Sequence, residues 1–426
     1  MGTTLAIALV ITMLLGMPVG MCLAVSSAVA MVLFQPDLFS TVPQKFLAGL
    51  DSFPLLAIPL FVLAGQLMAK GGLAKRIVDM ALVVVGRIHG GLGLVVIFST
   101  LLMSGISGSP AANTAGIGTV ALPAMKRLSY PPAFATAILA AAGGVSTLIP
   151  PAIDLIIIGV IASISIGGLF AAGILPGVLC GMGIMALAYY YSKKMGLPLV
   201  EPQSWGEKFR ILGQGLLPVL MVVIILGGIY SGMFTPTEAA SVAVVYGFIV
   251  TFFIYKELKL KDIPDVLLKT CSLTGVVILV LATANIFSFT LTIEQIPRLL
   301  AENITAVASS PIMFILFVHV LFFVLGMVMD CLPPILILMP MLVPIAEQYG
   351  FEPLHFGIIV AANVGLGMVS PPVGICLFVA CGVSETPIEK VVRPLLPFLV
   401  VLLISLMVIT FVPQISLFLP TLFGFR

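Results

Sequence analysis

The sequence predicts an all-α, polytopic membrane protein built from two inverted-topology repeats. Composition is the first reason, because 61% of the 426 residues are hydrophobic, only 8% are charged and the mean hydropathy is +1.27. Soluble domains carry about 25% charged residues. Second, the chain contains several apolar runs near the roughly 20 residues that a membrane-spanning helix needs. Third, a pattern of prolines and glycines recurs at a constant offset along the chain.

Composition also excludes several classes of protein. Nineteen Lys and Arg against seventeen Asp and Glu give a net charge of +2, and without a long basic run nucleic acid is not an expected partner.

The first apolar run, residues 4–34, has no charge ahead of it and no cleavage site. We therefore expect a first membrane segment, broken at Gly16-Met17-Pro18, instead of a removable signal peptide. The six cysteines lack paired spacing and are interpreted as small buried hydrophobes, and no organic cofactor is expected.

The repeat is defined by residue pairs that all differ by 221 positions. Periodic self-similarity of this kind indicates two copies of one structural unit. The matched pairs are Pro123 with Pro344, Pro132 with Pro353, Pro150 with Pro371, Pro151 with Pro372, Pro176 with Pro397, Gly105 with Gly326, and Gly144 with Gly365.

Charge predicts that the two copies lie upside down relative to each other. Lys126 and Arg127 follow the glycine-rich segment of the first repeat, whereas Glu347 and Gln348 occupy the matched place in the second. Cytoplasmic loops favour Lys and Arg, so the same loop is expected on opposite sides of the membrane. Inverted repeats with discontinuous helices are typical of secondary transporters.

Each repeat is expected to contain a re-entrant hairpin and a broken helix. Glycine-broken backbone at membrane depth survives only where protein covers it or where it lines a polar cavity, so we expect both hairpins at a binding site. Two amphipathic stretches, 73–88 and 293–304, are interpreted as interfacial. The first repeat is predicted at 1–200, with a hairpin at about 95–125 and a broken helix at 132–166. A cytoplasmic connector is predicted at 193–210. The second repeat is predicted at 211–426, with a hairpin at about 311–346 and a broken helix at 353–381.

Proline pairs at the two breaks predict sodium sites. A proline pair removes two backbone donors and leaves carbonyls one turn earlier without helical partners, here those of Ser146 and Thr147 and those of Gly367 and Met368. Sodium, a hard cation, takes such oxygen ligands. The alternative is that the glycines only permit close helix packing. The predicted sodium ligands are Ser107, Ser109, Gly143, Gly144 and Ser146 in the first repeat, and Gly326, Met329, Asp330, Gly365 and Gly367 in the second.

An organic anion is the expected substrate. Helix N-termini carry free amides and a positive dipole end, and half-helices start after each hairpin tip and after each proline pair. Asp154 has two open interpretations, a helix-start residue or a functional acid, whereas Glu238 on the first turn after Pro236 is interpreted as structural. The predicted substrate contacts are Asn113, Thr147, Asp154, Asn363 and Ser370.

An intramembrane serine protease is a remote alternative. Gly105-Ile106-Ser107-Gly108 has the GxSG form seen around intramembrane serine nucleophiles, and His319 is a conceivable base. However, the position matched to Ser107 is Val328, and no metal motif accompanies the serine. We therefore expect a transporter without enzymatic activity, and we expect His319 to be a packed or lipid-edge residue of its apolar helix.

The residues resemble the large membrane subunit of tripartite ATP-independent periplasmic (TRAP) transporters, the DctM-like family, over essentially the whole chain. The resemblance rests on GMPVG (16–20), SGISGSPAANTAGIG (104–118), AAGGVSTLIPPAIDLIIIG (141–159), FTPTEAA (234–240) and NVGLGMVSPPVG (363–374). Within the family, the chain most resembles the sialic-acid systems, with Asp330 at the tip of the second hairpin.

The resemblance implies a scaffold and a transport domain that move as an elevator, sodium coupling, and a multi-pass protein of the bacterial inner membrane. It implies a small four-helix membrane subunit, expected as a separate chain, and a periplasmic binding protein that delivers an organic acid, sialic acid first and a C4-dicarboxylate next. A stand-alone anion transporter or exchanger on the same plan remains the alternative.

Overall fold

The computed structural model describes residues 1–88, 90–198, 204–296 and 310–425, and within them the chain is helical without strands. Eight of the described helices are long and apolar enough to cross a membrane, by length and composition. The predicted all-α class is therefore confirmed.

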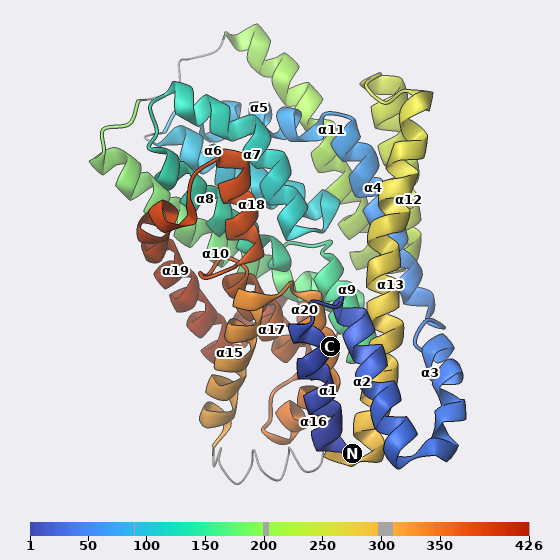
Figure 1. Cartoon of the computed structure of the whole chain (residues 1–426). Helices are drawn as coiled ribbons and strands as arrows, with labels where there is room; N and C mark the ends of the chain where they lie inside the picture. The colour runs from blue at the N-terminus through green and yellow to red at the C-terminus, as the bar shows by residue number, and fades with distance from the viewer. Residues whose placement is uncertain (89, 199–203, 297–309, 426) are drawn as a thin grey trace.

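One group of helices includes α13, the longest helix of the described chain, against which α2, α3 and α4 pack (Figure 1). Helix α4 packs against both α12 and α13, and α2 packs against α13 and α1. The expected break at Gly16-Met17-Pro18 separates α1 from α2. The group consists of α1 (Gly2–Leu14), α2 (Val19–Phe34), α3 (Val42–Ala48), α4 (Ala57–Lys70), α5 (Leu73–Val85), α11 (Trp205–Tyr230), α12 (Pro236–Ile249) and α13 (Ile263–Ile293).

A second group contains the two hairpins and the two broken helices. Each hairpin packs on a broken helix, α6 and α7 on α8 and α15 on α17, and the long helices α10 and α19 pack against both broken helices. The first repeat contributes α6 (Gly91–Ser107), α7 (Pro110–Arg127), α8 (Pro132–Val145), α9 (Ile153–Ile161) and α10 (Ile166–Lys194). The second contributes α15 (Pro311–Val328), α16 (Leu332–Gln348), α17 (Pro353–Gly367), α18 (Ile375–Ser384), α19 (Ile388–Phe411) and α20 (Gln414–Leu422).

The hairpins enter this group from opposite ends. Helices α6 and α7 lie at the end of the molecule where α5 is found, whereas α15 and α16 lie toward the end that carries the N-terminus (Figure 1). The charged pair Lys126-Arg127 closes α7, and Glu347 closes α16. The inverted arrangement expected from these loop charges is thus present.

Three details differ from the sequence expectations. The second half of the predicted connector 193–210 is helical, because Ser204 caps α11 and α11 starts at Trp205. A further helix, α20, follows the last expected span and begins after Pro413. Five cysteines are buried but Cys271 is exposed on α13. The amphipathic stretch 293–304 lies mostly outside the described residues.

The two breaks cross at matched glycines. A Cβ on Gly144 would lie 2.6 Å from the carbonyl oxygen of Gly365, and a Cβ on Gly365 would collide with the carbonyl oxygen of Gly144. Only glycine permits this approach of two backbones. The hydroxyl of Thr147 donates to the carbonyl of Ala361 at 3.1 Å, which ties one broken helix to the other.

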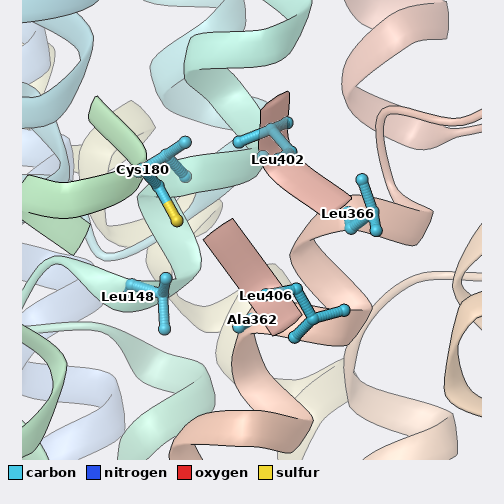
Figure 2. A pocket seen from close by; sticks show the side chains of 8 residues that line it. Leu148, Cys180, Ala362, Leu366, Leu402 and Leu406 are labelled. Atoms are coloured by element: carbon cyan, nitrogen blue, oxygen red, sulfur yellow. The ribbon is translucent and has the colours of Figure 1, made fainter. Parts of the chain in front are cut away.

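A small void of about 10 Å³ lies beside this crossing (Figure 2). Its wall is apolar, with leucines from both repeats and the side chain of Cys180 pointing toward it (Figure 2). The repeats therefore meet in a packed apolar seam next to their backbone contact. The lining residues are Gly144, Val145, Leu148, Cys180, Ala362, Leu366, Leu402 and Leu406.

Candidate functional site

A cavity of about 620 Å³ is lined by the first hairpin, α4 and α13. Ser107, Ser109, Asp154 and Asp330 of the predicted site line it, and all four lie at the hairpin tips or at the start of α9. From there the lining reaches Gly72 and Lys75, where α4 passes into α5. This volume suits a small organic molecule, since ligand pockets commonly span about 300–1,000 Å³.

The first predicted sodium site lies where α6 meets the break after α8. The hydroxyl of Ser104 donates to the carbonyl of Ser146 at 2.7 Å, and the amide of Ile153 donates to the carbonyl of Gly108 at 3.3 Å. The hydroxyl of Ser146 is buried and has no hydrogen-bond partner within the described chain. A buried hydroxyl oxygen without a hydrogen-bond partner is available to bind a cation.

The second predicted sodium site has the matching arrangement. Gly326 of α15 packs against Gly367 of α17, with a distance of 3.1 Å between a Cβ built on Gly326 and the Cα of Gly367. The amide of Gly374, after the proline pair, donates to the carbonyl of Met327 at 3.0 Å. In both repeats the hairpin therefore lies against the break of its own repeat.

The carbonyls before the proline pairs were expected to lack helical partners, and three of the four accept hydrogen bonds from other donors. Besides the bond from Ser104 to Ser146, the carbonyl of Gly367 accepts from the amide of Ser370 at 2.9 Å, and that of Met368 accepts from the amide of Cys376 at 2.9 Å. The chain turns back after the second proline pair, so its own amides replace the missing helical donors. Sodium would then use the second lone pairs of these oxygens.

Asp154 lies between the two hairpin tips. It is 2% exposed and occupies the first turn of α9. Its neighbour Ile153 is bonded to the first tip, and its own Oδ1 accepts from the Sγ of Cys331 at the second tip, at 2.9 Å. The same thiol lies 3.3 Å from Oδ1 of Asp330, which also accepts from the backbone amide of Cys331. Helix-start and functional interpretations of Asp154 are thus compatible.

The structure keeps the other predicted substrate contacts away from the cavity lining. Asn113 accepts from the hydroxyl of Ser107 at 2.6 Å, and the hydroxyl of Ser370 donates to the carbonyl of Leu366 at 2.8 Å. Asn363 is fully buried between α17 and α15, with its amide donating to the carbonyl of His319 at 3.1 Å.

Ser107 and His319, the two residues of the catalytic alternative, form hydrogen bonds with different partners. The Nε2 of His319 bonds with the hydroxyl of Thr410 at 3.1 Å, so the histidine is a packed residue that connects α15 to α19. Ser107 is held by Asn113. Glu238 has the structural role expected of it, because it forms a capping box with Thr235 at the start of α12.

Sequence reasoning missed several residues at the site. Ser104 was not singled out, because one serine on an apolar helix carries no signal of its partner 42 residues away. Lys75 was assigned to an interfacial helix, and Gln66 of α4 was not considered, yet both line the cavity. The polarity of Gln66 within an otherwise apolar helix is the signal that could have identified it.

Comparison with known families agrees with this architecture. Residues 6–415 match the family described as "Tripartite ATP-independent periplasmic transporter, DctM component". The chain belongs to this family. The DctM component is thus a multi-pass membrane transporter subunit, and the relatives reported below are named as permeases, not as enzymes.

Relatives of this DctM component differ in the substrate that they are named for. The C4-dicarboxylate TRAP transporter large permease of Pseudomonas aeruginosa is 39% identical, over 94% of each chain. The sialic acid TRAP transporter large permease of Vibrio cholerae is 38% identical, over 96% of each chain. The isethionate TRAP transporter permease protein of Oleidesulfovibrio alaskensis is 37% identical over 95% of this chain but only 64% of that protein.

A solved structure shares the fold. The YdaH transporter of Alcanivorax borkumensis superposes with a TM-score of 0.63, covering 92% of this chain and 89% of its own, at 16% sequence identity.

Proposed function

We propose that this DctM component performs sodium-coupled uptake of an organic acid anion. The observation that carries the proposal is the arrangement of a hairpin against a proline-broken helix in each repeat, beside one shared cavity of about 620 Å³. Carbonyls and the unpartnered hydroxyl of Ser146 are suitable ligands for sodium. A sodium ion at each break would offset the negative charge of the incoming substrate.

Movement of the hairpin-bearing helices past α4 and α13 would give alternating access. The two groups meet through α5 with α6 and α7, through α4 with α6 and through α13 with α16, and a sliding motion would carry the cavity from one end of the molecule to the other. The cavity runs toward Lys75, at the end where Lys126-Arg127 closes α7. By the preference of cytoplasmic loops for Lys and Arg, this state releases substrate to the cytoplasm across the bacterial inner membrane.

Sialic acid is the first substrate to test and a C4-dicarboxylate the second. The cavity is large enough for a nine-carbon sugar acid, and relatives of nearly equal identity are named for each of the two substrates. Delivery by a periplasmic binding protein and association with a small membrane subunit complete the proposal, in keeping with the tripartite family description.

The test is uptake by proteoliposomes that contain this chain with its small subunit and binding protein. An inward sodium gradient is expected to drive accumulation of labelled sialic acid or dicarboxylate, and a potassium gradient is not. Equal uptake with potassium would refute sodium coupling. Undiminished uptake after omission of the binding protein would instead favour a stand-alone anion transporter.

A further inference from the structure

Asp154 and Asp330 occupy the inner end of the cavity, and their position carries an inference that rests on the proposed function. We infer that these two carboxylates form a cation-binding site at the junction of the hairpin tips, built on Asp154 and separate from the predicted sodium sites at the two breaks, although Asp330 is also a predicted ligand of the second of them. The ligand is a small monovalent cation, either sodium or a proton. The site would make anion binding depend on cation binding.

An unpartnered oxygen points to this ligand. Oδ2 of Asp154 is buried and has no hydrogen-bond partner in the described parts of the chain, while Oδ1 accepts the thiol of Cys331. A buried carboxylate oxygen without a partner is costly in a membrane interior. Because Asp154 and Asp330 both line the cavity, a cation that arrives from the cavity can satisfy this oxygen.

The position of Asp154 gives such a cation a coupling role. The first tip is bonded to Ile153, and the second tip is bonded to Asp154 itself through Cys331. A cation bound here therefore contacts the junction at which both hairpins meet. Its arrival would change the interactions of the two tips together, whereas an ion at either break contacts one repeat.

The charge balance of the cavity supports the same inference. Titratable groups around Asp154 are Asp330 and Cys331 at the second tip, Cys376 at the start of α18, and Lys75 at the other end of the cavity. Helix α4 contributes Gln66 but no charged side chain to the lining. An organic anion beside two carboxylates would be repelled, so neutralisation of these acids must accompany substrate binding.

The test measures cation binding to the purified full-length chain in lipid nanodiscs. Equilibrium binding of radioactive sodium is compared at pH 6 and pH 8 for the wild type and for Asp154→Asn, which keeps the size of the side chain. If sodium is the ligand, the variant binds about one ion fewer per chain. If the ligand is a proton, sodium affinity depends on pH in the wild type and loses that dependence in the variant. Unchanged stoichiometry, affinity and pH dependence would overturn the inference.

A second pair of variants leaves both carboxylates in place. Cys331→Ala removes the donor to Oδ1 of Asp154 and is expected to shift the half-saturating cation concentration by about 2- to 10-fold, the size of one hydrogen bond. Cys331→Ser keeps a donor and should restore the wild-type value. Identical cation binding by the wild type, Cys331→Ala and Cys331→Ser would contradict the inference even if Asp154→Asn failed to fold.

Asp265→Asn provides the matched control, because Asp265 is an exposed acid on α13 whose partner is Lys269. It should bind cations as the wild type does. The readout also separates this inference from the proposed function. Sodium-driven uptake by the wild type together with unchanged binding by Asp154→Asn would refute only the inference, whereas wild-type uptake that ignores sodium would refute the proposed function itself.

Discussion

Gly144→Ala tests the backbone crossing between the two repeats. The new Cβ would lie 2.6 Å from the carbonyl oxygen of Gly365, a backbone atom that cannot rotate away. The broken helices must separate to relieve the clash, and overpacking of this kind costs about 1–3 kcal/mol. The equilibrium constant for unfolding should rise by a factor between about 5 and about 160.

The assay is unfolding of the purified chain in mixed micelles, followed by far-UV circular dichroism. Gly275→Ala is the control, because a Cβ at that position of α13 meets nothing within 4 Å, and alanine should leave stability unchanged or slightly raised. The double variant of Gly144 and Gly365 should cost less than the sum of the single variants, because one separation relieves both clashes. A Gly144→Ala protein as stable as Gly275→Ala would refute the close crossing.

Three further outcomes follow from the site. Ser104→Ala should lose about 1–3 kcal/mol of stability, because the carbonyl of Ser146 loses a buried donor. The same variant should weaken sodium binding in the nanodisc assay. Ser272→Ala, at an exposed position of α13, should change neither stability nor sodium binding. Asn363→Ala should lower the melting temperature by removing the link between α17 and α15, with the sodium dependence of uptake retained; a loss of sodium dependence at full stability would contradict a purely packing role. Burial raises the pKa of Asp79 on α5 above its usual 3.8, against the opposing charges of Lys75 and Arg76. The contribution of Asp79 to the stability of the folded state therefore declines as pH rises through 3.8 toward the raised pKa. Melting curves should show Asp79→Asn to be more stable than the wild type at pH 7 and no more stable below pH 3.8.

The register of the prolines predicted most of the architecture. Because Pro150-Pro151 and Pro371-Pro372 interrupt their helices chemically, the breaks could be located without tertiary information. Loop charges gave the inversion for a similar reason, since the preference of cytoplasmic loops for Lys and Arg acts on the local sequence. Hairpin positions followed from glycine-broken backbone at membrane depth and from the repeat.

Contacts between distant segments could not be predicted in this way. The bond from Cys331 to Asp154 joins residues 177 positions apart, and nothing in either local sequence specifies the other. The donors to the carbonyls of Gly367 and Met368 could not be predicted either, because the turn that returns later amides to them depends on the three-dimensional path. Asn363 resembled a ligand residue for the same reason, since polarity alone does not distinguish a substrate contact from a buried link between two helices.

The void of about 10 Å³ beside the crossing has a consequence for leakage. A water molecule needs roughly this much space together with two to four polar partners, and leucine side chains dominate the wall here (Figure 2). This part of the seam therefore stays dry. A dry seam offers no wire of water molecules along which an ion could cross from one break to the other. A continuous file of water molecules would let ions leak and would dissipate the gradient on which a secondary transporter relies. The apolar wall therefore acts as a barrier to ion leakage between the two halves of the site.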